Sequence, residues 1–239
     1  MMKTFITLFR TEAKLSLRGG DMLFFGLLFP SAIMLLIGFI SGREAMTLAF
    51  GGIATVGICA SGLMGIPLTF ASYRREKILK RFKVTPVSPA MLLLADTLLQ
   101  CVYAWISGLA VFLIAKYGFD LVFGGGAGRY ILTFLFVQFS IYGIGFLIAA
   151  LAPDIKIANL VCSLVYFPTL FLSGATVPYE IMPKGLQLFS DAFPLTQGIK
   201  LLKGAVLGLD PAADLVKMIV LAAIAVVSYG ISLAFFRWE

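Results

Sequence analysis

Six long apolar stretches, separated by short polar connections, constrain this chain more than any other feature of its sequence. A helix that crosses about 30 Å of hydrocarbon needs about 20 apolar residues, and it satisfies its backbone polar groups internally. Only 13% of the 239 residues are charged, whereas soluble domains carry roughly 25%. We therefore expect an all-α integral membrane protein with a single domain, residues 1–239. Its six predicted transmembrane helices cover residues 22–40, 47–70, 89–115, 130–151, 157–172 and 211–236.

Residues 3–18 have the pattern of an amphipathic helix that precedes the first span. About one third of its helical wheel is polar, and Phe and Leu side chains fill most of the rest. The polar stripe comprises Lys3, Thr7, Arg10, Thr11, Lys14 and Arg18. A basic stripe opposite an apolar face suits a helix in the headgroup plane, so we predict an interfacial helix. The alternative is a secretory n-region, but no small-residue cleavage signal follows the first apolar stretch.

Two further stretches predict how the spans are packed and connected. In the second span, Gly57, Ser61 and Gly65 recur every four residues, a spacing that lets another helix approach closely. Residues 173–209 begin with Ser173 and Gly174 and are then broken by prolines, so their segments are too short to span. These prolines are Pro178, Pro183 and Pro194. We predict an extracytoplasmic helical hairpin between the fifth and sixth spans.

The distribution of Lys and Arg predicts the orientation. Twelve of these side chains fall on the side of the N-terminus and seven on the other side. Ten of the twelve lie in two short segments, the N-terminal helix and the loop 71–88. Cytoplasmic loops carry the excess of positive charge, so both termini are expected in the cytoplasm.

The sequence offers little to an enzyme. It contains no histidine, which removes Ser-His dyads and HExxH zinc sites, an intramembrane protease among them. Cys59, Cys101 and Cys162 each lie in an apolar stretch and form no metal-binding spacing. There is no GxxxxGK[ST] motif for ATP. We therefore expect no catalytic residue, no metal, no cofactor on this chain and no nucleic-acid partner. Asp96, inside the third span, is either a structural polar contact or a functional group.

The loop 71–88 contains the run SYRREKILKRFKVTPVSP at residues 72–89. As a helix over 74–83, it has a narrow apolar face of Ile78, Leu79 and Phe82 among basic side chains. Positive charge alone would hold this loop in the cytoplasm and attract it to anionic lipid. The apolar face and the embedded Glu76 favour a second reading, in which the helix docks onto a partner protein.

Two motifs carry a resemblance to a known family. The loop leads into a TPxSP-like turn at Thr85–Pro89, and a second motif runs from Ser173-Gly174 to Pro194-Leu195-Thr196. In these features, in the N-terminal helix and in the six spans, the chain resembles the permeases of type-2 ABC transporters. The loop departs from the family pattern ERE-x-GTLE, because it reads RREKILKR and lacks the glycine and the second acid.

The resemblance implies the permease subunit of a prokaryotic exporter in the cytoplasmic membrane, surrounded by lipid. A separate ATPase subunit would bind ATP and magnesium, and the permease would form a homodimer or pair with a similar subunit. The substrate would be hydrophobic or amphipathic: a drug, a peptide antibiotic or a lipid. An ATP-independent secondary carrier or channel-like protein is the alternative.

The resemblance also implies roles for particular residues. The residues that contact the ATPase would be Arg74, Arg75, Glu76, Ile78, Leu79, Arg81 and Phe82. The residues along the substrate path would be Tyr166, Phe167, Phe171, Gly57 and Ser61. The outer hairpin would be shaped by Ser173, Gly174, Pro178, Pro183 and Pro194.

Overall fold

The computed structural model describes residues 2–20, 23–40, 43–78, 81, 88–121, 123–177, 179 and 182–235. Within these ranges the chain forms helices and no strand. Six helical segments are long and apolar enough to cross a membrane. They are Leu23–Ile40, Met46–Arg75, Ala90–Gly118, Ala127–Leu151, Ile155–Leu172 and Leu215–Phe235. The predicted all-α membrane fold with six spans is therefore confirmed.

The first three spans contain π-helical turns. The elements are α1 (Met2–Gly19), η1 (Leu23–Leu28), α2 (Phe29–Ile40), α3 (Arg43–Ile53), α4 (Val56–Cys59), η2 (Ala60–Gly65), α5 (Ile66–Arg75), α7 (Pro89–Leu113) and η3 (Ile114–Gly118). The π-helical segments η1, η2 and η3 interrupt the first, second and third spans in turn. Such segments often occur at functional sites.

Several of the remaining elements begin at polar caps or prolines. They are α8 (Ala127–Leu151), α9 (Ile155–Leu172), α10 (Lys184–Ser190), α11 (Pro194–Leu207), the short 3-10 helix η5 (Pro211–Asp214) and α12 (Leu215–Phe235). The carboxylate of Asp154 accepts hydrogen bonds from the first amides of α9 at 2.8 and 2.9 Å. Pro194 and Pro211 occupy first turns, where the missing amide costs nothing.

The second span is the centre of the bundle: 83% of its apolar window is buried, against 17–50% for the other five. Its small residues make this possible. A Cβ added to Gly145 of α8 would lie 2.0 Å from the carbonyl oxygen of Gly62 in η2. Beside this crossing, the hydroxyls of Ser61 and Tyr142 are hydrogen-bonded at 2.7 Å. The close packing of the small-residue stripe is thus made within the subunit, against α7 and α8.

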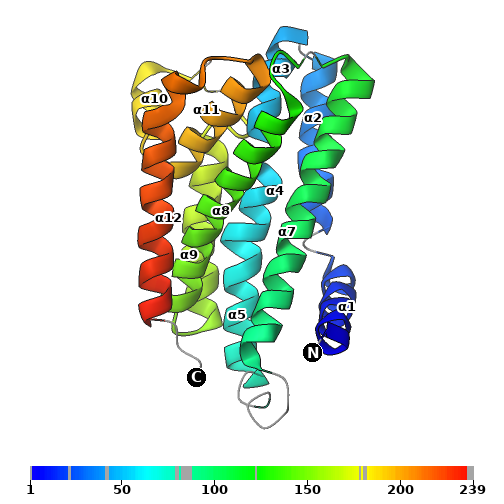
Figure 1. Ribbon diagram of the computed structural model, residues 1–239, viewed down its shortest axis with the longest axis vertical. Coiled ribbons are helices and arrows are strands. Elements are labelled where there is room, and N and C mark those ends of the chain that lie inside the picture. Colours follow the sequence, from blue (N-terminus) through cyan, green and yellow to red (C-terminus); the bar gives the residue numbers. More distant parts are fainter. Residues whose placement is uncertain are drawn as a thin grey trace.

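Figure 1 shows the spans side by side, with different elements at the two ends of the bundle. At one end lie α1, which is seen foreshortened beside α7, and the last turns of α5 and α12. At the opposite end lie α3, α10 and α11. We call these the α1 end and the hairpin end.

At the hairpin end, α10 and α11 follow the fifth span. Ten residues of the 14-residue helix α11 are buried, and it packs against α3, α8 and α12. At 1.5 Å per residue this helix is about 21 Å long, too short to cross the bilayer. Pro183 precedes α10 and Pro194 begins α11. Ser173 and Gly174 form the turn after α9, where Gly174 has φ +91°. Pro178 lies outside the described residues.

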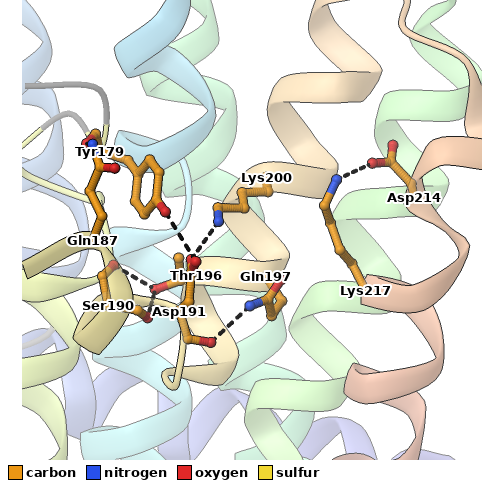
Figure 2. A network of polar contacts seen from close by, with 9 residues as sticks. All are labelled: Tyr179, Gln187, Ser190, Asp191, Thr196, Gln197, Lys200, Asp214 and Lys217. Atoms are coloured by element: carbon orange, nitrogen blue, oxygen red, sulfur yellow. Dashed lines mark hydrogen bonds and ion pairs between the residues drawn. The ribbon is translucent and has the colours of Figure 1, made fainter. Parts of the chain in front are cut away.

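A polar network holds this hairpin together (Figure 2). Asp191, after α10, accepts a 3.1 Å hydrogen bond from the Tyr179 hydroxyl and forms an ion pair with Lys200 of α11. Its carbonyl accepts a hydrogen bond from the Gln197 amide at 2.8 Å. Next to it, Asp214 pairs with Lys217 at 2.7 Å and with Arg129 at 3.4 Å. The first group of contacts joins α10 to α11, and the second joins α8 to η5 and the start of α12.

Candidate functional site

A cleft of about 670 Å³ opens at the α1 end of the bundle. Its walls come from α1, from η1 of the first span, from η2 and α5 of the second, from α7 and from α9. These elements come from four separate stretches of the sequence, so only the folded bundle creates the site. Two of the three π-helical segments, η1 and η2, form part of its wall.

One wall of the cleft is polar. Asp96 and Gln100 lie one turn apart on α7, with exposed fractions of 2% and 3%, and Tyr73 of α5 is also buried. The amide of Gln100 donates to Asp96 Oδ1 over 3.5 Å. Among the described residues, Asp96 Oδ2 and Gln100 Oε1 have no hydrogen-bond partner, whereas the Tyr73 hydroxyl lies near the carboxyl group of Glu12. Two residues that line the cleft, Asp96 and Gln100, therefore each keep one buried oxygen atom that can accept a hydrogen bond.

The amphipathic helix α1 supplies a second carboxylate, Glu12. This residue is the most buried one described in α1, and it lies on the face that packs against α7. Burial raises the pKa of Glu12, while the nearby Tyr73 hydroxyl opposes that shift. The lining described for this cleft contains the acids Glu12, Glu76 and Asp96 but no Lys or Arg. In a chain with net charge +7, this local excess of negative charge is unusual.

Another part of the cleft wall is apolar. Phe25 from η1, Met64 and Leu68 from the second span, and Phe167 from α9 line it. Tyr166 lies beside them, with 1% of its side chain exposed and its hydroxyl without a partner within the described ranges. The cleft can therefore accept an apolar body on one side and a polar group on the other.

The residues predicted for the substrate path fall in three places. Tyr166 and Phe167 line the cleft. Phe171, one turn further along α9, is 51% exposed on the surface of the subunit and does not appear in the cleft lining. Gly57 and Ser61 are buried inside the helix packing; a Cβ on Gly57 would lie 2.4 Å from the Ser107 hydroxyl. The small size of these two residues allows helices of the same subunit to pack closely.

The predicted coupling segment begins where α5 ends, but it is not a continuous helix. The helix ends at Arg75, and Lys77 has φ +55°, so the chain turns there. Before the turn, Arg74 donates to the carbonyl oxygen of Ala149 at 2.5 Å, which links the second span to α8. Glu76 and Ile78 line the cleft. Arg75 and Arg81 are exposed, and Leu79 and Phe82 lie outside the described residues.

A second cavity, of about 590 Å³, lies between α7 and α8. Its lining is mostly aromatic and aliphatic, with Trp105, Phe112, Tyr130 and Phe134 as its largest rings. Leu109 and Ile131 on its wall are more than half exposed on the spanning helices, where lipid is the solvent. This cavity has no buried carboxylate in its lining, so the α1-end cleft is the stronger candidate site.

A bundle of six spans with an amphiphile-sized cleft, in a sequence that lacks an ATP-binding motif, defines a membrane-spanning transport subunit. The model of the ABC-2 type transporter family matches residues 3–207. The chain therefore belongs to the ABC-2 type transporter family, as a multi-pass permease component that is not itself the catalyst. Permeases of this family generally work with an ATP-binding partner.

A characterised relative supports the same assignment. Nodulation protein J of Neorhizobium galegae is 27% identical over 191 residues, which cover 77% of this chain and 70% of that protein. The resemblance seen in the loop and hairpin motifs is thus confirmed at the level of the family.

Proposed function

We propose that this permease exports a hydrophobic or amphipathic substrate, a drug, peptide antibiotic or lipid, from the cytoplasm or the inner leaflet. The observation that carries the proposal is the cleft at the α1 end, with an apolar wall that includes Phe25 and Phe167 and a polar wall that includes Asp96. A molecule with an apolar body and a polar end matches both walls. A separate ATPase subunit, which binds ATP and magnesium, drives the cycle by rocking the spans.

The ATPase is proposed to dock at the α1 end. The exposed Arg75 and Arg81, the turn at Lys77 and the basic stripe of α1 all belong to this end. Excess positive charge is typical of cytoplasmic loops, so both termini are assigned to the cytoplasm and the hairpin to the outer face. The membrane is the cytoplasmic membrane of a prokaryote, with α1 in the headgroup layer.

Two permease subunits are proposed to form the complete path, either two copies of this chain or this chain with a similar one. Transporters commonly place the substrate site between repeated units. The first and fifth spans bury only 17% and 28% of their apolar windows within the subunit. Large side chains such as Leu160, Leu164 and Phe171 remain exposed on α9. These faces are available to a second permease or to lipid.

The test is co-expression with a P-loop ATPase encoded by a neighbouring gene, followed by purification and reconstitution. We expect the ATPase to co-purify and its hydrolysis to be stimulated by substrate. Phe82→Ala should lower coupled transport on the order of tenfold, since an interface aromatic contributes 1–2 kcal/mol or more. Phe235→Ala is the matched control, because it removes an exposed aromatic ring at the end of α12, outside the loop 71–88.

Two results would contradict the proposal. Transport by the permease alone, driven by an ion gradient, would make it a secondary carrier. Transport at the parental rate by Phe82→Ala, with the ATPase still bound, would remove the docking role of this loop and leave the family assignment intact.

A further inference from the structure

We propose that the α1-end cleft binds the cationic group of an amphipathic substrate, an ammonium carried on an apolar body. The proposal rests on the export function above and narrows it, since it names the chemical class that the cleft recognises. Asp96, Gln100 and Glu12 form the recognition end, and the apolar wall holds the remainder of the substrate.

The first argument is the inventory of hydrogen-bonding atoms. Asp96 and Gln100 are at least 97% buried, yet each keeps one oxygen atom without a partner within the described part of the chain. Buried polar atoms are nearly always satisfied in native structures, so such orphans call for an explanation. Both residues line the cleft, and both oxygen atoms are hydrogen-bond acceptors. An ammonium group, which has three N–H donors and no acceptor, matches them.

The second argument is charge. Glu12 of α1 and Asp96 of α7 line the same cleft, and the charge of Glu12 acts on Asp96. Placing two carboxylates together away from water is unfavourable unless a positive group offsets them. No Lys or Arg does so among the residues described in the cleft lining. The bound substrate is proposed to supply the positive charge.

A metal ion is the other cation to consider. The described residues contain no group of three or more His, Cys, Asp or Glu side chains that could hold one. The apolar part of the wall comprises Phe25, Met64, Leu68 and Phe167. These side chains offer no oxygen or nitrogen ligand to a metal ion, but they suit an alkyl or aromatic body. An organic cation uses both walls, and its cost of desolvation is offset by the two acids.

Direct binding to the purified permease tests this without an ATPase. The probe is dansylcadaverine, a fluorophore with a primary ammonium on a five-carbon chain, and its N-acetyl derivative has the same body without the charge. Fluorescence enhancement is measured in phosphatidylcholine nanodiscs with and without the permease. We expect the ammonium probe to bind at least tenfold more tightly than the acetylated probe, a difference of about 1.4 kcal/mol.

The variants locate the site. Asp96→Asn should weaken the binding of the ammonium probe by tenfold or more and leave the binding of the acetylated probe unchanged. Glu12→Gln, on a helix outside the spans, should weaken it several-fold and serves as the second variant if Asp96→Asn folds poorly. Asp210→Asn is the matched control, because it removes an exposed carboxylate at the hairpin end and Asn still caps the helix.

Lipids and soluble molecules can both carry an ammonium group, and the nanodisc composition separates them. Displacement of the probe when phosphatidylethanolamine is added identifies a lipid headgroup as the ligand. Binding that resists this lipid identifies a soluble amphiphilic amine.

Equal affinity for the two probes, or unchanged binding by both acid variants, would overturn the proposal. ATP-driven transport without any preference for an amine would reject this inference and retain the export function. Selective binding of the amine without substrate-stimulated ATP hydrolysis would support this inference and contradict the proposed export function.

Discussion

The two ends of the molecule treat their carboxylates in opposite ways. At the hairpin end, Asp191 contacts Lys200 and Tyr179, and Asp214 contacts Lys217 and Arg129. At the α1 end, the one hydrogen bond to the Asp96 side chain from the described residues is a long one from Gln100. Glu12 shares its surroundings with a phenol and a second acid. Lys and Arg side chains therefore offset the charges of Asp191 and Asp214, whereas the described lining around Asp96 and Glu12 contains no Lys or Arg.

This difference separates polar side chains that stabilise the fold from polar side chains that are free to bind a ligand. Removing one partner from a satisfied pair leaves a buried charge behind, so the hairpin network should resist substitution. An acid without a partner contributes nothing comparable to stability, and a polar group inside the membrane is costly. The comparison predicts that substitutions at the hairpin end reduce stability, while those in the cleft alter binding and leave stability nearly unchanged.

The largest effect on stability is expected at Asp214. Asp214→Ala leaves Arg129 and Lys217 without their acid at the start of α12, where the side chain of Asp214 is 8% exposed. The free energy of unfolding should fall by about 2 kcal/mol. This is less than the full value for a buried ion pair, because both cations are partly solvated. In detergent this lowers the melting temperature by roughly 4–8 °C.

The control for this measurement is Asp210→Asn, which should stay within about 0.5 kcal/mol of the parent. A melting temperature of Asp214→Ala equal to that of the control would mean that the hairpin network is not structural, and the comparison between the two ends would fail.

A smaller loss is expected at Asp191. Burial alone would lower the pKa of Lys200, but Asp191 and Tyr179 outweigh it and raise the pKa above the ordinary value of 10.5. The pair is more exposed than Asp214, so Asp191→Asn should cost about 1 kcal/mol. Because the folded pKa is raised, this stabilisation is complete below pH 10.5 and is lost as the pH rises through the folded value.

Melting curves from pH 8 to 12 check this prediction. The parent should lose stability above pH 10.5, and Asp191→Asn should lose less over the same interval. Lys184→Met is the matched control, since Lys184 is exposed at the start of α10 and its removal should leave the pH dependence of the parent. An equal pH dependence in parent and Asp191→Asn would assign the alkaline loss to other groups.

Much of the fold followed from composition and local chemistry. Six apolar stretches of sufficient length predicted six spans, because no water is available to a backbone inside the bilayer. The prolines of residues 173–209 predicted short helices in place of a seventh span, and Pro183 and Pro194 do stand at the starts of α10 and α11. The loop and hairpin motifs together predicted the family.

The cleft could not be predicted in the same way. Glu12 and Asp96 are 84 positions apart, and only the docking of α1 on α7 brings them together. The sequence did contain a sign that Glu12 is buried, because this acid lies between Phe5 and Leu8 on the apolar face of the helix, opposite the basic stripe. Likewise, the spacing of Gly57 and Ser61 predicted close packing correctly, but spacing alone does not say which helix approaches. The turn at Lys77 depends on a left-handed backbone that its sequence does not signal.

The smallest predicted effect concerns the docking of α1 through Glu12. Burial raises the pKa of this carboxyl, so the docked helix favours the protonated form. The stability contributed by a group of this kind is complete below its ordinary pKa of 4.5 and falls as the pH rises through the raised value. Docking of α1 should therefore be tighter at acid pH. At neutral pH, Glu12→Gln should stabilise the docking of α1 by less than about 1 kcal/mol.

Hydrogen exchange of the amides in α1 measures this, with rates corrected for the intrinsic effect of pH. The parent should show greater protection at pH 5 than at pH 8, and Glu12→Gln should show similar protection at both. Lys14→Gln, on the exposed basic stripe of the same helix, should keep the pH dependence of the parent. Protection that increases from pH 5 to pH 8 would mean that Glu12 is held as a carboxylate by a cation in the cleft even without substrate. The contrast between the two ends of the molecule would then disappear.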